Sequence, residues 1–140
     1  MRYLVDANVL SEATRPDPDE EVLAWLRRHE SEIVIDPFIL GEMAFGIRLL
    51  PAGRRRQRLE RWFQGVVSRI ACIPWDAATG LRWATLLADL RRSGRQMPVK
   101  DSLIAATALV HGLTVVTRNV RDFEGAGLPV LDPFARSAAE

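Results

Sequence analysis

Short apolar segments alternate with longer helical segments along this chain, and this alternation constrains the fold more than any other feature. The predicted strands are residues 2–5, 33–35, 70–73, 113–117 and 129–131. Strands that are apolar throughout are typical of a parallel sheet covered on both faces, because each face must be buried. We therefore predict an α/β protein, a three-layer α/β/α sandwich with a four- to five-stranded parallel sheet.

The predicted helices lie between these strands. We expect them over 38–50, 54–67, 76–93 and 101–111, after a first helix that follows the turn at 15–19. Pro37 suits the first turn of a helix, where its missing N–H is not needed. Asp76 is a good N-cap, and Gly112 is a typical residue to end a helix.

Length and composition indicate one domain. The chain has 140 residues, of which 48% are apolar and 26% charged, the balance of a soluble globular protein. We assign residues 1–134 to a single domain and 135–140 to a short polar tail. No apolar run approaches the ~20 residues that cross a bilayer, and the N-terminus lacks the apolar stretch of a signal peptide. Together with the lone Cys72, which can form no internal disulfide, these features favour a cytoplasmic protein that does not act at a membrane.

The basic residues are nearly all arginine, although the net charge is only +1. Lys100 is the single lysine. A GC-rich genome explains this bias, and so does contact with phosphates, which the guanidinium group fits well. Arg54, Arg58 and Arg61 share one face of a predicted helix. That face either follows a nucleic-acid backbone or is simply solvated.

Four acids occupy unusual positions. Asp6 ends the first strand, and Glu42 lies beside the apolar stripe of its helix. Asp101 stands at a predicted helix start, and Asp122 follows the fourth strand. Each has a structural alternative: a helix cap for Asp6 and Asp101, an ion pair with an arginine for Glu42, and a solvated loop for Asp122.

The predicted sheet brings these four acids together. Ligands of open α/β sheets bind beyond the carboxyl ends of the strands. Carboxylates that converge there repel one another unless a cation neutralises them, and Mg²⁺ or Mn²⁺ prefers such oxygen ligands. No ligand-like spacing of His29, His111 or Cys72 favours zinc.

Motifs of other hydrolase and nucleotide-binding classes are absent from the sequence. There is no G-x-x-x-x-G-K-[ST] loop and no G-x-S-x-G elbow. Metal-assisted hydrolysis of a phosphodiester bond is the chemistry that remains. A water would attack in line while the metal stabilises the leaving 3′ oxygen, which leaves 5′-phosphate and 3′-hydroxyl ends.

The sequence resembles a known nuclease family along residues 1–134. The motifs that carry this resemblance are VDANVLSE, ILGEMAFGI and VKDSLIAATALVHGLTVVTRNVRDF. In this order they are similar to the PIN-domain ribonucleases, and more narrowly to the VapC toxins of toxin–antitoxin pairs in their FitB-like subgroup.

The resemblance implies a role for individual residues. Asp6, Glu42, Asp101 and Asp122 fall on the metal-binding, catalytic positions. Asn8, Thr117 and Asn119 match residues that support the site, and Ser11 and Glu12 match a structural or supporting pair. Ala7 departs from the pattern, since the family often has Thr there, which leaves the efficiency of the enzyme open.

The resemblance also implies partners: an RNA substrate, a second copy of the chain in a homodimer, and a cognate VapB-like antitoxin through which operator DNA is bound. Four basic residues near the acids could hold RNA phosphates or pair with the acids themselves. They are Arg118, Arg121, Lys100 and Arg95.

Two other functions compete with an Mg²⁺-dependent endoribonuclease toxin. A catalytically weak PIN-like module could act with an antitoxin in operator DNA binding. A phospho-acceptor receiver domain would also be a small α/β protein, but it needs an acidic pair after the first strand, where this chain has only Asp6.

Overall fold

A computed structural model of the chain describes residues 1–134 and contains one five-stranded sheet. The strands are β1 (Tyr3–Val5), β2 (Ile33–Ile35), β3 (Ala71–Cys72), β4 (Thr114–Val116) and β5 (Val130–Leu131). All neighbouring strands are parallel, in the order β3-β2-β1-β4-β5. The central strand β1 aligns Tyr3 with Ile33 on one side and with Thr114 on the other. The parallel sheet predicted from the apolar strands is confirmed.

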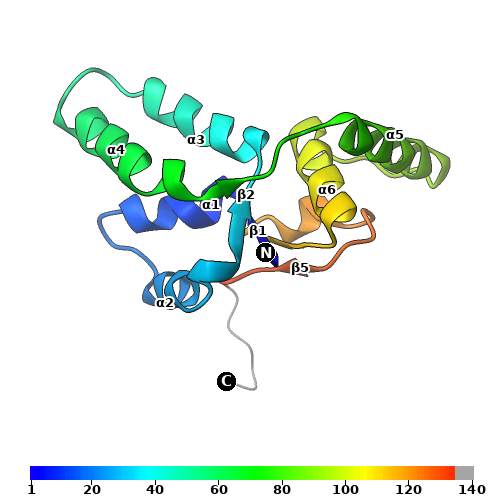
Figure 1. The fold of residues 1–140 in the computed structure, drawn as a ribbon, viewed down its shortest axis with the longest axis horizontal. Coiled ribbons are helices and arrows are strands. Elements are labelled where there is room, and N and C mark those ends of the chain that lie inside the picture. Colours follow the sequence, from blue (N-terminus) through cyan, green and yellow to red (C-terminus); the bar gives the residue numbers. More distant parts are fainter. Residues whose placement is uncertain (135–140) are drawn as a thin grey trace.

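The helices lie on both sides of the sheet. The α-helices are α1 (Ala7–Leu10), α2 (Glu20–Arg28), α3 (Pro37–Arg48), α4 (Arg54–Gly65), α5 (Ala77–Arg92) and α6 (Val99–His111). The short 3₁₀ helices are η1 (Ser11–Thr14), η2 (Glu30–Glu32), η3 (Val67–Arg69) and η4 (Val120–Phe123). In Figure 1, α1 to α4 lie to one side of the strands and α5 and α6 to the other. This is the predicted α/β/α arrangement.

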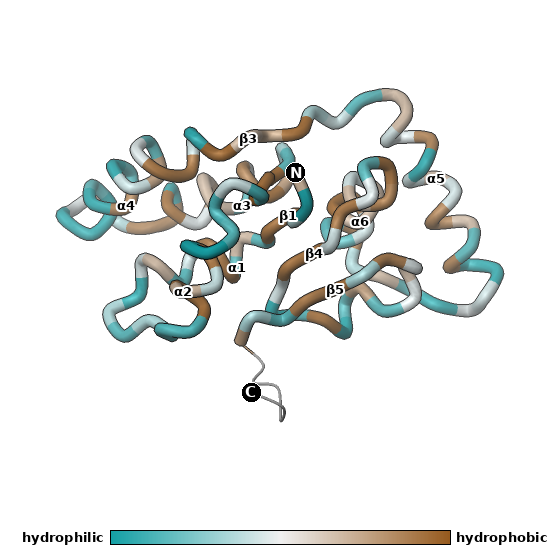
Figure 2. Tube along the Cα trace, turned by 60° about the horizontal axis from the view of Figure 1, so that its bottom comes forward, coloured by the Kyte–Doolittle hydropathy of each residue, from teal (hydrophilic) through white to brown (hydrophobic). Residues whose placement is uncertain are grey.

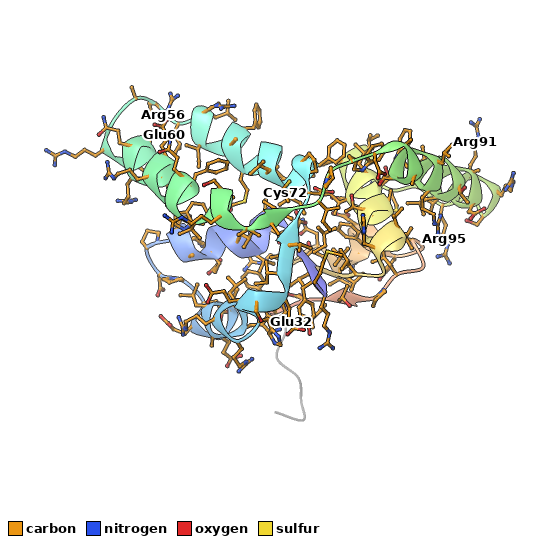
Figure 3. All side chains as sticks on the ribbon, viewed as in Figure 1. Glu32, Arg56, Glu60, Cys72, Arg91 and Arg95 are labelled. Atoms are coloured by element: carbon orange, nitrogen blue, oxygen red, sulfur yellow. The ribbon has the colours of Figure 1, made fainter. Side chains whose placement is uncertain are left out.

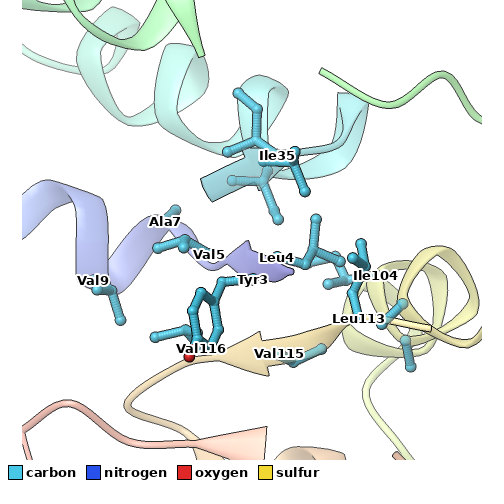
Figure 4. Close-up of a cluster of buried hydrophobic side chains, with 14 of the residues drawn as sticks. Tyr3, Leu4, Val5, Ala7, Val9, Ile35, Ile104, Leu113, Val115 and Val116 are labelled. Carbon is cyan, nitrogen blue, oxygen red and sulfur yellow. The ribbon is translucent and has the colours of Figure 1, made fainter. Parts of the chain in front are cut away.

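The core is built from the central strands and the helix faces that cover them. Figure 4 shows Leu4 and Val5 of β1 between Ile35 of β2 and Val116 of β4, with Ile104 of α6 beside them. All five side chains are fully buried. Figure 2 shows the same pattern along the chain, with apolar residues on the strands and polar residues on the outer helices. Burial of apolar area is the main stabilising contribution to such a fold.

Buried and exposed aspartates begin several helices. Asp36 accepts hydrogen bonds from the amides of Phe38 (3.0 Å) and Ile39 (2.9 Å) at the start of α3. Asp76 accepts one from Thr79 N at 3.0 Å, so its predicted role as the cap of α5 is confirmed. Gly112 ends α6 with a left-handed φ of 64°, as predicted.

Helix α6 begins earlier than predicted. It starts at Val99 rather than at Asp101, and Pro98 stands at its N-cap without a side-chain hydrogen bond. The structural alternative for Asp101, a helix cap, is therefore wrong. Pro98 starts the helix because its ring fixes φ where a helix begins, so no polar cap is needed.

Helix α4 carries the arginine-rich segment on an exposed outer surface. Trp62 and Phe63 pack against the core, whereas Val66 is half exposed. Arg56 forms an ion pair with Glu60 at 2.8 Å, and both residues are labelled on α4 in Figure 3. Within residues 1–134, no helix is long and apolar enough to span a membrane.

Candidate metal centre

Asp6 is buried at the carboxyl end of the central strand. Its Oδ1 accepts a hydrogen bond from Ala7 N at 2.8 Å, and its Oδ2 accepts one from Thr117 Oγ1 at 2.9 Å. Asp6 is therefore the N-cap of α1, but it also faces other acids. Burial raises the pKa of Asp6, and the charge of Glu42 raises it further, against the lowering effect of the Thr117 and Ala7 hydrogen bonds.

Asn8 and Thr117 connect Asp6 to the loop after β4. Thr117 is fully buried, and its hydroxyl oxygen accepts a hydrogen bond from Asn119 N at 3.1 Å. Asn8 Nδ2 lies 3.3 Å from Thr117 Oγ1 and 3.4 Å from Asp6 Oδ2, and Asn8 Oδ1 accepts the amide of Arg118 at 3.0 Å. The sequence positions 6–8 and 117–119 are thus held together as one unit.

Glu42 pairs with a lysine rather than with an arginine. Its Oε2 lies 2.8 Å from Lys100 Nζ, across the space between α3 and α6. This oxygen is buried and makes no hydrogen bond of ordinary geometry. Burial opposes the charge on Lys100, but Glu42, Asp6 and Asp101 together raise the pKa of Lys100. Lys100 is a cation already located among these carboxylates.

Asp101 lies in the first turn of α6 and is largely buried. Burial raises the pKa of Asp101 to about 6, and the charge of Asp6 contributes next. Asp122 and Glu42 raise this pKa as well, while Lys100 lowers it. Asp122 lies in η4, and its amide donates to Asn119 O at 3.0 Å. The charges of the other three acids thus all act on Asp101, although the four come from four different segments.

The donor set fits a hard divalent cation. Four carboxylates, two of them with raised pKa, are the oxygen ligands that Mg²⁺ and Mn²⁺ prefer, and the buried Glu42 Oε2 makes no hydrogen bond of ordinary geometry with the described residues. In the arrangement described, no group of three or more His, Cys, Asp or Glu side chains within residues 1–134 is positioned to hold an ion. Lys100 stands at Glu42 instead, so binding of an ion there requires Lys100 to move.

A fifth acid, Asp36, was missed by the sequence analysis. It follows β2 directly, as Asp6 follows β1, and it is completely buried. Burial raises the pKa of Asp36, against the hydrogen bonds from Ile39, Thr107 and Phe38. The sequence carries a signal for this residue, because Asp36 follows an apolar strand directly and stands before Pro37 at a helix start.

The other residues singled out from the sequence occupy different places. Glu12 is buried away from this cluster: it accepts the amide of Asp19 at 2.8 Å and pairs with Arg15, so it supports the turn before α2. Arg95 lies beside the end of α5 and packs against Gly125, where an added Cβ would lie 2.9 Å from its Nη1 (Figure 3).

Arg118 and Arg121 are exposed on the loop after β4. Arg118 stacks on the ring of Phe134, with its guanidinium carbon 3.8 Å from the ring centre. The turn that presents this ring is fixed by the Phe134 amide, which donates to Asp132 at 2.8 Å. A stacked guanidinium uses its face for the ring and keeps its N–H groups for other partners.

The model of the PIN domain matches residues 3–127, most of the chain. The chain belongs to the PIN-domain family. It is 35% identical over 135 residues to VapC ribonuclease Y4jK of Sinorhizobium fredii, covering 94% of this chain and 96% of that protein. It is 34% identical over 138 residues to Toxin FitB of Neisseria gonorrhoeae, covering 94% and 97%.

A solved structure agrees with this placement. The structure of FitAB bound to a DNA fragment matches with a TM-score of 0.90 and 30% identity, over 99% of both chains. The VapC and FitB likeness read from the motifs is confirmed, and so is the fold.

Proposed function

We propose that this PIN-domain chain is the toxin of a toxin–antitoxin pair and acts as an Mg²⁺- or Mn²⁺-dependent endoribonuclease. The observation that carries the proposal is that the charges of Asp6, Glu42 and Asp122 all act on the buried Asp101, which gathers four acids at one site. Similarity to a VapC ribonuclease and to Toxin FitB supports the same activity. The products would carry 5′-phosphate and 3′-hydroxyl ends, because water rather than a ribose 2′-hydroxyl attacks.

The four acids would hold the divalent ion. The chemistry that such an ion supplies is activation of a water molecule for attack and stabilisation of charge on the leaving 3′ oxygen. Thr117 and Asn8 fix the Asp6 carboxylate, since each can donate to its Oδ2. Asn119 in turn donates its amide to Thr117, which holds the loop against the site.

The basic residues near the acids would bind the RNA backbone. The backbone amide of Arg118 donates to Asn8, and its guanidinium group stacks on the ring of Phe134. These contacts orient the side chain, and the guanidinium N–H groups would bind a phosphate. Lys100, once released from Glu42, would be a second phosphate contact. Arg121 is exposed on the same loop, and Arg95 is a more distant candidate.

The partners follow from the relatives. FitB is found in a FitAB complex on DNA, which supports a VapB-like antitoxin for this chain and operator binding only through that antitoxin. A cytoplasmic location is part of the same proposal, because RNA is the substrate and Cys72 forms no disulfide within residues 1–134. A homodimer is also proposed, on the resemblance to the VapC toxins alone.

The test is cleavage of total RNA by the purified chain with Mg²⁺, with Mn²⁺ and with EDTA. We expect cleavage with either ion and none with EDTA, and end-group analysis should find 5′-phosphates. Asp101→Asn should be inactive. Asp89→Asn, a change of an exposed acid on α5, is the matched control and should cleave normally.

Cleavage that persists in EDTA would contradict the metal mechanism. The competing function, a weak PIN-like module, would be favoured if the complex with the antitoxin binds operator DNA tightly while the free chain cleaves no RNA with either ion.

A further inference from the structure

Asp36 uses its two carboxylate oxygens for two different helices. Oδ1 accepts the amides of Phe38 and Ile39 and so begins α3. Oδ2 accepts a hydrogen bond of 2.8 Å from the hydroxyl of Thr107, which lies in α6 and is 71 residues away in sequence. Capping α3 needs only the first oxygen, so the second bond is an additional connection between helices.

The two helices joined in this way each carry a site acid. Glu42 follows Asp36 by six residues along α3, and Asp101 precedes Thr107 by six residues along α6. Lys100, which pairs with Glu42, belongs to the same turn of α6 as Asp101. The spacing between Glu42 and Asp101 therefore depends on how α3 and α6 lie against each other.

Asp36 itself is not one of the charges that dominate the site. The charges that act on Asp101 are those of Asp6, Lys100, Asp122 and Glu42. Asp36 has no exposed surface, and both of its oxygens accept hydrogen bonds from the framework. Its chemistry is that of a fixed connection rather than of a ligand.

We propose that Asp36 and Thr107 are positioning residues: their hydrogen bond sets the distance between Glu42 and Asp101 and thereby the affinity of the site for a divalent ion. Lys100 pairs with Glu42 in the metal-free protein, but it must leave when an ion binds. The carboxylates on the two helices then repel each other, and that repulsion acts to separate α3 from α6. A hydrogen bond to a buried carboxylate is short and strong, because the surroundings are apolar, and it opposes this separation. The inference rests on the metal site proposed above.

The chain contains a matched pair for a control. Asp76 also caps a helix, α5, and also accepts a threonine hydroxyl, that of Thr79 at 2.8 Å. Thr79 is fully buried, as Thr107 nearly is. The Asp76–Thr79 bond lies within one helix, however, and joins no two acids of the site. Loss of the hydroxyl should affect packing in both cases but ion binding in only one.

The experiment is calorimetric titration of the full-length chain with Mn²⁺ for the wild type, Thr107→Val, Thr107→Ser and Thr79→Val. Urea denaturation of the EDTA-treated proteins measures their stability in parallel. Thr107→Val should weaken Mn²⁺ binding by about 10- to 100-fold, the usual effect of removing a residue that orients metal ligands. Thr107→Ser, which keeps the hydroxyl, should restore most of the affinity, and Thr79→Val should bind Mn²⁺ like the wild type.

Two results would overturn the proposal in different ways. Wild-type affinity in a folded Thr107→Val would remove the positioning role and leave the metal site intact. Absence of Mn²⁺ binding in the wild type would remove the metal site and the positioning role together. If Thr107→Val does not fold, Thr107→Ala, which also lacks the hydroxyl but is smaller beside Asp36, replaces it with the same expected loss.

Discussion

Two buried aspartates end neighbouring strands and look alike in their immediate surroundings. Asp6 follows β1 and Asp36 follows β2, and each begins the next helix. Each also accepts a threonine hydroxyl from far along the chain, Thr117 at 2.9 Å and Thr107 at 2.8 Å. Burial raises the pKa of both.

The difference lies in what surrounds each carboxylate beyond its hydrogen bonds. The charge of Asp6 raises the pKa of Lys100 and of Asp101, and the charge of Glu42 raises the pKa of Asp6. Asp36 instead joins α3 to α6 in the interior. The charge of Asp6 also raises the pKa of Asp36, but neither Glu42 nor Lys100 is among the charges acting on Asp36. Two aspartates with the same local hydrogen bonds thus differ in role: Asp6 belongs to the charged cluster, and Asp36 joins two helices.

The largest expected effect comes from the same substitution at both aspartates. Asparagine caps a helix as well as aspartate, so Asp6→Asn and Asp36→Asn should both fold. Asp6→Asn removes a ligand charge and should lower RNA cleavage by at least about 10³-fold, the order of effect for a lost electrostatic group in an active site. Asp36→Asn should lose only about tenfold, because an amide can still join the two helices.

Rates of RNA cleavage at one fixed Mn²⁺ concentration below saturation, with circular dichroism as a check on folding, measure this contrast. Equal losses in the two variants would mean that the carboxylates do not differ in role.

A smaller effect is expected on stability as a function of pH. The pKa of Asp101 is 3.8 in the unfolded chain and about 6 in the folded one, so the folded protein holds the proton more tightly. Raising the pH through this interval favours unfolding and lowers the stability of the metal-free protein by about 3 kcal/mol at most. Asp101→Asn should lack this loss and so exceed the wild type in stability at pH 7.5 but not at pH 4.

Urea denaturation in EDTA at the two pH values gives the measurement. Added Mn²⁺ should then stabilise the wild type and Asp36→Asn, but not Asp101→Asn. A metal-free wild type whose stability relative to Asp101→Asn does not change with pH would contradict the raised pKa of Asp101, which burial causes first and the neighbouring acids second.

The smallest expected effect concerns Arg118, which lies in the exposed loop after β4. Arg118→Ala should raise the KM for RNA about tenfold with little change in kcat, since Arg118 would contact phosphate rather than the reacting atoms. Phe134→Leu should raise KM less, because it removes only the stacking that orients Arg118. Arg92→Ala, at an exposed arginine of α5, is the control.

Binding of RNA to the inactive Asp101→Asn background at several salt concentrations supports the kinetics. Loss of one phosphate contact should reduce the slope of log K against log salt by about 0.7, the value per contact for a single strand. An unchanged slope in Arg118→Ala would exclude this contact.

Much of the fold was predictable because it depends on local patterns. Apolar runs such as 33–35 and 113–117 indicated buried parallel strands, and Asp76 and Gly112 marked helix ends that the structure has. The start of α6 was predicted two residues late, because Asp101 is a typical N-cap residue in the sequence, whereas Pro98 is the N-cap in the structure.

The site was only partly predictable. The positions of the four acids relative to the strands were visible in the sequence, and Lys100 was one of the bases expected to pair with them or with phosphates. Which acid Lys100 pairs with was not visible: the alternative given for Glu42 was an arginine, and Lys100 takes that place. Asp36 was overlooked because its role depends on Thr107, and no sequence pattern connects residues 71 positions apart.

The sequence by itself determined which segments are strands and helices, and which acids stand where strands end, because backbone preference and the period of apolar residues act over a few neighbouring positions. The tertiary structure alone decided which of these acids repel one another and which are neutralised, since charge interactions depend on distance and burial in three dimensions. Asp6 and Asp36 have similar positions in the sequence. The packing of α3 against α6 gives Asp36 a hydrogen bond to Thr107, and the charge of Glu42, on α3, acts on Asp6.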